Sequence, residues 1–193
     1  SSLAGCGISY IHIEVDGKEI PLLDGSAIQW VKAFEEVGIK KVPKPANFME
    51  GVNQSQIFNQ NDSVISLIPS EKLTIISTID FQYKAIGSQT FIIDLNPRDY
   101  VDMIAPARTF GFKDQFEELR ELGLIKGGNL ENALVCDGDN WVNPPLRFAN
   151  EPIRHKILDL IGDLALVGLP KAQIMVYKGS HSLNALLASS LNS

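Results

Sequence analysis

The sequence has 193 residues, of which 45% are hydrophobic and 21% are charged, and its formal net charge at pH 7 is −6. This composition can bury a globular core and excludes a disordered chain, and the net negative charge argues against nucleic-acid binding, because nucleic-acid-binding domains usually carry a basic patch. No apolar run approaches the roughly 18 residues that indicate a membrane span.

The first forty residues predict one strand and one helix. Apolar and polar residues alternate from Ile8 to Val15, as they do in a half-buried strand. Apolar residues then recur at helical spacing from Ala27 to Val37, and Gly38 is typical of a residue that closes a helix. The basic, proline-containing segment from Lys40 to Pro45 predicts a linker and a domain boundary.

Strands and helices alternate in the rest of the chain. Segments rich in β-branched residues predict strands at Val64–Ile68, Leu73–Ile79 and Thr90–Leu95. Two further strands are expected at Asn132–Cys136 and Ala172–Tyr177. Helices are expected from Asn96-Pro97 to Ile104, and at Phe112–Leu122, Pro152–Val167 and Ser182–Leu191. These elements predict an α/β or α+β protein without internal repeats.

One helix combines an apolar face with a polar stripe. His155, Asp159 and Asp163 are four residues apart, so they lie on the same side of the predicted helix 152–167. An imidazole and a carboxylate at this spacing can reach one divalent ion. Two ligands do not make a metal site, however, and the alternative is an ordinary solvated face of the helix.

The other two histidines and the two cysteines are less informative. His181 lies between a predicted strand and a predicted helix, where it can act as an acid or a base or be incidental to a helix cap. His12 lies in the first predicted strand as a surface or cross-strand residue. Cys6 and Cys136 predict no disulfide framework and favour a reducing compartment.

Five ordered motifs resemble the UDP-3-O-acyl-N-acetylglucosamine deacetylases, a family of zinc enzymes of lipid A biosynthesis. The matching segments are Pro21–Ser26 (PLLDGS), Ala107–Phe112 (ARTFGF), Gly127–Ala133 (GGNLENA), Leu146–Phe148 (LRF) and Arg154–Leu164 (RHKILDLIGDL). The resemblance implies an α+β fold of two βαβ-like domains, each a sheet layered with helices. Residues 1–43 would be the end of the first domain, which is only partly present, and residues 44–193 would be the second.

The resemblance also implies a role for particular residues. His155 and Asp159 would bind Zn²⁺, Asp163 would orient His181 as acid or electrostatic stabiliser, and Thr109 would help to hold the oxyanion. The expected contacts with a UDP-linked acylated glucosamine come from Lys156 at the phosphates, from Asp80 and Phe81 at the uridine, and from Phe110 and Gly111.

Some expected parts of the family pattern are missing. The third zinc ligand and the general base belong to a Val-Glu-His motif, which would lie just upstream of Ser1 and does not occur in these 193 residues. We therefore expect the chain by itself to be inactive. Gly179-Ser180-His181 stands for the family's Ser-Gly-His, and Lys126 lies next to the expected acyl-chain passage, so the resemblance does not specify the acyl chain.

The main hypothesis is a zinc-dependent deacetylase that acts as a monomer in the bacterial cytoplasm, or in an organelle if the organism is eukaryotic. The alternative is a truncated, non-catalytic paralogue that binds a nucleotide or a protein.

Overall fold

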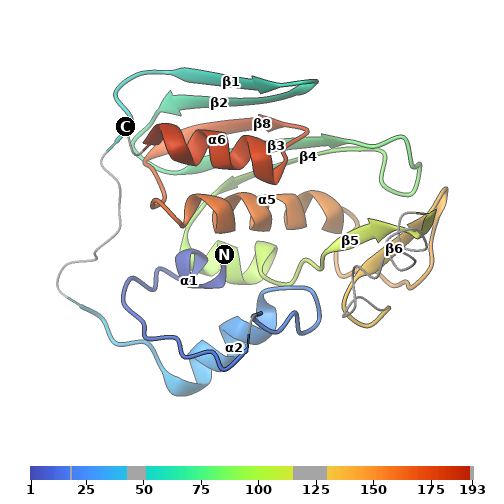
Figure 1. The fold of residues 1–193 in the computed structure, drawn as a ribbon, viewed down its shortest axis with the longest axis horizontal. Coiled ribbons are helices and arrows are strands. Elements are labelled where there is room, and N and C mark those ends of the chain that lie inside the picture. Colours follow the sequence, from blue (N-terminus) through green and yellow to red (C-terminus); the bar gives the residue numbers. More distant parts are fainter. Residues whose placement is uncertain (18, 43–50, 115–129, 192–193) are drawn as a thin grey trace.

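The computed structural model in Figure 1 describes residues 1–193 apart from 18, 43–50, 115–129 and 192–193. The described residues form an α+β fold with two sheets, which confirms the predicted fold class. Residues 43–45 of the predicted linker, the proposed boundary between residues 43 and 44, and most of the predicted helix at 112–122 lie outside the described residues. The division into two domains therefore stays a prediction.

The larger sheet has five strands in the order β1-β2-β8-β3-β4. Only the central β8–β3 pair is parallel, with Ile174 opposite Ile75, and the other pairs are antiparallel. A crossover connection is needed to bring β8 beside β3 in parallel, and helix α5 lies within it. The strands are β1 (Gln56–Gln60), β2 (Ser63–Pro69), β3 (Thr74–Asp80), β4 (Ser88–Asp94) and β8 (Ala172–Tyr177).

The smaller sheet lies at one end of the molecule (Figure 1) and has the order β5-β6-β7. Its strands are β5 (Phe110–Phe112), β6 (Leu134–Asp137) and β7 (Asn140–Trp141). Phe112 therefore ends a strand and does not begin a helix. The β5–β6 pair is parallel, with Gly111 opposite Val135.

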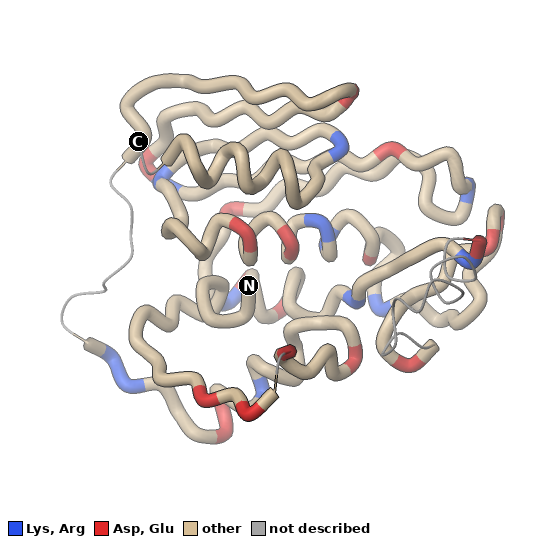
Figure 2. Tube along the Cα trace, viewed as in Figure 1, with Lys and Arg blue, Asp and Glu red and all other residues tan. Residues whose placement is uncertain are grey.

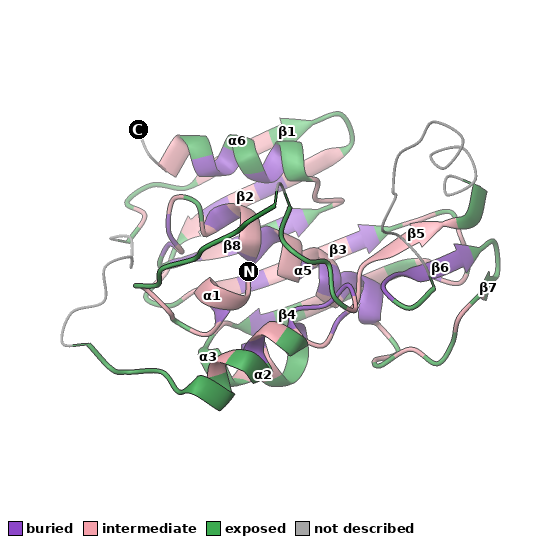
Figure 3. Ribbon diagram, turned by 60° about the horizontal axis from the view of Figure 1, so that its bottom comes forward, coloured by how far each residue is buried: buried purple, intermediate pink, exposed green. Residues whose placement is uncertain are grey.

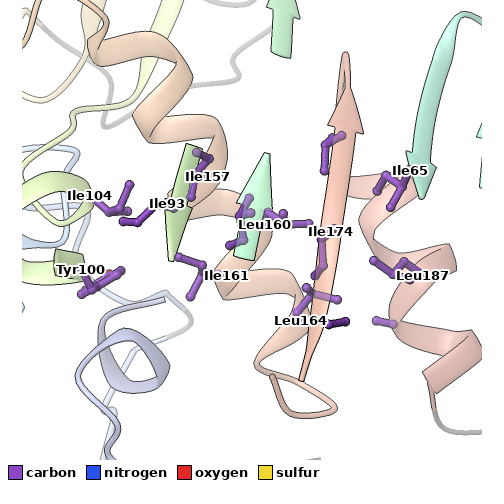
Figure 4. Packing of buried hydrophobic residues seen from close by; sticks show 14 of the residues in the cluster. Ile65, Ile93, Tyr100, Ile104, Ile157, Leu160, Ile161, Leu164, Ile174 and Leu187 are labelled. Carbon is purple, nitrogen blue, oxygen red and sulfur yellow. The ribbon is translucent and has the colours of Figure 1, made fainter. Parts of the chain in front are cut away.

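Helices α5 and α6 cover one face of the larger sheet. Helix α5 packs on β3 and β4, and α6 packs on β1 and β2. Figure 4 shows the resulting core, in which Ile157, Leu160, Ile161 and Leu164 of α5 lie among Ile93, Ile174 and Leu187. The helices are α1 (Ser2–Gly5), α2 (Ile28–Val37), α3 (Pro97–Asp99), the π-helical turn η1 (Tyr100–Ile104), α5 (Glu151–Leu164) and α6 (His181–Leu191).

A third layer lies on the far side of α5 from the sheet. It contains α1, η1 and α2 (Figure 1), and both α1 and η1 contact α5. Helix α5 is therefore covered on two sides, which explains why apolar residues surround its polar stripe. Among the helices of the described residues, none combines the length and the hydropathy that crossing a bilayer requires.

Two predicted details of the strands are wrong. Residues 8–15 form no strand, and most of them are exposed, as Figure 3 shows for the segment near the N-terminus. Their alternation is compatible with a sheet, but no described strand pairs with them, and pairing is what makes a strand. Strand β1 was not predicted, because three of its five residues are Gln or Asn, which strands tolerate at an exposed edge.

Candidate active site

Helix α5 positions the first pair of site residues. The sequence favours a helix here, because Pro152 is in the first turn and apolar residues recur at 3.6-residue spacing. His155 Nε2 lies 3.4 Å from Asp159 Oδ1. At zinc–ligand distances of about 2.0–2.1 Å, two ligands of a tetrahedral ion lie about 3.3–3.4 Å apart. The two side chains are therefore spaced as neighbouring ligands of one zinc ion.

The orientation of the His155 ring is fixed from its other side. Its Nδ1 lies 3.0 Å from the carbonyl oxygen of Ala107. Because a carbonyl only accepts hydrogen bonds, Nδ1 must carry the proton, and Nε2 of the neutral ring keeps a free lone pair. The side chain is almost completely buried, and burial lowers the pKa of His155, although the nearby Asp159 carboxylate opposes this effect.

A second histidine–carboxylate pair joins α5 to α6. His181 Nδ1 lies 2.8 Å from Asp163 Oδ2, which also accepts a hydrogen bond of 2.9 Å from Asn184 Nδ2. The other ring nitrogen of His181 lies 4.0 Å from Asp159 Oδ2. The two pairs are thus neighbours, and the predicted residues 155, 159, 163 and 181 meet at one place although α6 follows α5 only after strand β8.

Acidic and basic residues both lie along α5, as the colours of Figure 2 show. Lys156 Nζ donates a hydrogen bond of 3.0 Å to Asp159 Oδ2, the carboxylate oxygen that does not face His155. One oxygen of Asp159 therefore faces the His155 imidazole, and the other faces the Lys156 ammonium group.

A cavity of about 840 Å³ opens beside the His155–Asp159 pair. Thr109 lines this cavity together with His155 and Asp159. The backbone N–H of Thr109 donates a hydrogen bond of 2.7 Å to the carbonyl oxygen of Gly25. The remaining wall is mostly apolar and comes from residues 1–3, from a subset of residues between 11 and 34, and from Leu158. His12, exposed on an extended segment, lies at this wall near Glu14. The cavity therefore offers an acyl or acetyl group an apolar surface next to the polar pairs.

A smaller cavity of about 310 Å³ contains the residues expected at the nucleotide. Asp80, Phe81 and Lys156 line it together with Lys178, whose Nζ lies 3.6 Å from Asp80 Oδ2 and 2.9 Å from Asp62 Oδ2. The structure thus unites three predicted residues from different elements. The sequence analysis missed Lys178, although its position just after β8 was a usable signal.

Aromatic rings connect the two areas. The ring of Phe110 makes edge contacts with Phe81, at 5.7 Å between centroids, and with His155, at 6.4 Å. Gly111 follows in β5 without a side chain. Phe110 therefore lies between the ring expected at the uridine and the imidazole expected at the metal.

The donor set is incomplete as a metal site. Among the described residues there is no group of three His, Cys, Asp or Glu side chains that could hold an ion. His155 and Asp159 are thus spaced to act as two ligands of a zinc ion, and the described residues offer no third member of such a group. Both Cys6 and Cys136 are free thiols.

Comparison with known proteins gives consistent matches over the whole chain. A sequence profile of the family described as UDP-3-O-acyl N-acetylglycosamine deacetylase matches residues 1–193. A protein of Nostoc sp. named UDP-3-O-acyl-N-acetylglucosamine deacetylase is 48% identical over 193 residues, covering 97% of this chain and 69% of the relative. The namesake from Synechocystis sp. is 45% identical over 190 residues, with the same coverage. A protein of Arabidopsis thaliana named "Probable UDP-3-O-acyl-N-acetylglucosamine deacetylase 1, mitochondrial" is 39% identical over 209 residues, covering 97% of this chain and 64% of the relative.

Proposed function

This chain belongs to the UDP-3-O-acyl-N-acetylglucosamine deacetylase family, and on that premise we propose that it hydrolyses the acetamide of a UDP-linked, 3-O-acylated N-acetylglucosamine. The products are acetate and the free amine, and the proposed pathway is lipid A biosynthesis. The observation that supports this reaction best is the convergence of two histidine–carboxylate pairs beside one cavity, with His181 Nε2 only 4.0 Å from Asp159 Oδ2.

His155 and Asp159 would hold the zinc ion, as their 3.4 Å separation supports. When bound, zinc with an open coordination position lowers the pKa of water towards neutrality and polarises a carbonyl. The third ligand and the general base expected from the family motif are absent from the 193 residues. We propose that turnover requires the histidine and the glutamate of a Val-Glu-His motif, which this sequence does not contain.

His181 is the acid in this proposal. Asp163 accepts the Nδ1–H bond, which leaves the protonated Nε2–H free to give its proton to the departing amine. The carboxylate stabilises the imidazolium and aligns the ring, as in other histidine–carboxylate pairs. The Thr109 side chain lies at the same cavity, where its hydroxyl can donate a hydrogen bond to the oxyanion.

The smaller cavity would take the UDP group. Lys156 and Lys178 can pair with the diphosphate, while Asp80 and Phe81 offer a carboxylate and an aromatic face to the uridine. Phe110 and Gly111 would contact the sugar between the two cavities. Because Lys156 also contacts Asp159, the phosphates and the metal ligand are connected through one side chain.

Zinc content and nucleotide affinity of the full 193-residue chain test this proposal. Because one protein ligand is missing from the described residues, we expect only weak zinc binding, measured by equilibrium dialysis in a zinc-containing buffer, and we expect it to be lost in His155→Ala and Asp159→Asn but not in the matched control His12→Ala. Calorimetry with UDP should show affinity that falls about tenfold in Lys156→Met, since a phosphate contact is lost, but not in Lys84→Met, whose cation pairs with Asp139 and lines neither cavity.

The outcomes separate the candidate functions. Zinc that survives in His155→Ala would contradict the deacetylase proposal. UDP binding without any zinc binding would favour the non-catalytic nucleotide-binding paralogue. We further propose a monomer, located in the bacterial cytoplasm or in an organelle; the mitochondrial label in the Arabidopsis relative's name supports the second location.

A further inference from the structure

Two side chains from one turn of α5 form hydrogen bonds with the C=O and the N–H of a single peptide group. This peptide joins Ala107 to Arg108. Its carbonyl oxygen accepts the hydrogen bond from His155 Nδ1 at 3.0 Å, and its N–H donates to Glu151 Oε1 at 3.0 Å. Glu151 and His155 are four residues apart, so they project from the same side of the helix. The chain of contacts therefore runs from carboxylate to peptide to imidazole.

Glu151 is completely buried and binds four N–H donors. Arg108 contributes its backbone N–H at 3.0 Å, Nε at 2.9 Å and Nη2 at 3.2 Å, and the backbone N–H of Arg147 contributes a fourth bond of 2.6 Å. An ionised carboxylate has about four lone-pair sites, so its accepting capacity is filled. A side-chain amide of the same shape cannot replace it, because its NH₂ group would face an N–H donor.

The same arrangement is anchored to the N-terminal part of the chain. The Arg147 guanidinium donates hydrogen bonds to Asp24 Oδ2 at 2.7 Å, to Ser26 Oγ at 3.1 Å and to the Pro106 carbonyl at 2.8 Å. Pro106 directly precedes the held peptide. The peptide therefore has little freedom to turn away from His155 while Glu151 is in place.

We propose that Glu151 is a positioning residue that determines the tautomer and orientation of His155 through the Ala107–Arg108 peptide. This inference rests on the proposed function, in which Nε2 of His155 binds zinc. The carboxylate polarises the peptide N–H, and hydrogen bonds in such a chain strengthen one another, so the carbonyl becomes a better acceptor for Nδ1–H. A firm Nδ1–H bond directs the Nε2 lone pair at the position beside Asp159.

The imidazole nitrogens of the ¹⁵N-histidine-labelled full chain provide a direct test without metal, and the chain has only three histidines to resolve. In the wild type we expect His155 to be the Nδ1–H tautomer with a slowly exchanging proton. In Glu151→Gln we expect the Nδ1–H signal to lose its protection and the two nitrogen shifts to move toward each other. Zinc affinity should fall about tenfold or more, the usual size of effects on residues that orient a ligand.

Asp24→Asn is the matched control. It removes a carboxylate from the same network, and a partner of Arg147, without touching the Ala107–Arg108 peptide. Because Arg147 keeps its bonds to Ser26 and Pro106, we expect the His155 signals to change much less in this variant than in Glu151→Gln. An unchanged spectrum in Glu151→Gln, or an equal change in Asp24→Asn, would overturn the positioning role.

If Glu151→Gln does not fold, the NMR spectrum of the wild-type chain tests the proposal instead. An Nε2–H tautomer of His155 contradicts the proposal outright, and an Nδ1–H tautomer with a slowly exchanging Arg108 amide supports it. The wild type can show the expected His155 tautomer, and Glu151→Gln can lose it, while neither protein binds zinc. That result would refute the proposed function but leave the role of Glu151 in orienting His155 intact.

Discussion

Gly25 lies where the cavity wall meets the segment that carries Thr109, and we expect Gly25→Ala to be strongly destabilising. Its φ is +77°, a conformation that L-residues with a Cβ seldom adopt. A Cβ built at this position would lie 1.9 Å from the backbone oxygen of Asn132 and 3.0 Å from a methyl carbon of Thr109. Since the nearer atom belongs to the backbone, a side-chain rotation cannot relieve the clash.

The cost can be worked out in two parts. A left-handed φ costs an L-residue about 1–2 kcal/mol. Relieving the clash requires the 24–26 turn to move away from residue 132, which weakens the 2.7 Å hydrogen bond from Thr109 N–H to the Gly25 carbonyl. Losing that bond adds about 0.5–1.5 kcal/mol, and the backbone shift adds about 1–3 kcal/mol more. The free energy of unfolding should therefore fall by about 3 kcal/mol or more.

Gly38→Ala is the matched control, because it isolates the first part. Gly38 has a φ of +79°, nearly the same as Gly25, but an added Cβ would meet nothing within 4 Å. With ψ at 150°, Gly38 lies in an extended region that is almost restricted to glycine, so we expect a conformational cost of about 1–3 kcal/mol without a clash. Urea unfolding followed by tryptophan fluorescence would give both values, with an unchanged m-value showing that only stability differs. A loss in Gly25→Ala no larger than that in Gly38→Ala would refute the reasoning.

Three further predictions concern buried groups. Burial raises the pKa of Tyr100, so the neutral phenol stabilises the fold below its unfolded pKa of about 10 and this stability is lost as the pH rises; tyrosinate absorbance from this residue should appear only together with alkaline unfolding. A thiol reagent should react with the half-buried Cys6 in the native chain and with the buried Cys136 only in denaturant, and rapid native labelling of both would contradict this packing. Ile161→Ala, in the centre of the core, should cost about 2–5 kcal/mol in the same urea assay, and a loss below that of an exposed Leu166→Ala would be inconsistent with Figure 4.

Local patterns in the sequence were sufficient for the regular elements near the site. The apolar periodicity and the proline after residue 150 predicted α5, and strand β8 was predicted with its bounds as observed. The i,i+4 spacing placed His155 and Asp159 on one side of that helix, and the structure confirms that they are neighbours. These inferences hold because helix and strand geometry is repetitive, so neighbours within one element follow from residue spacing.

The segment at residues 8–15 shows where such reasoning fails. Its alternation satisfies the periodicity of a strand, but a strand also needs hydrogen-bonding partners from another part of the chain. In the described residues it has none and stays exposed. Pairing is a property of two segments, so one segment's pattern cannot establish it.

The sequence by itself determined the α+β class, the helix carrying the candidate metal ligands and, through ordered motifs, the resemblance to one enzyme family. The resemblance also implied that Asp163 orients His181, and the two side chains are in contact in the structure. Only the tertiary structure decided that Lys178 joins Asp80 and Lys156, and that Glu151 binds the peptide N–H next to Ala107. These contacts join residues that lie 18 to 98 positions apart or come from different layers. Their geometry follows from how the helices pack on the sheet and on each other. The spacing of residues along one element does not specify that packing.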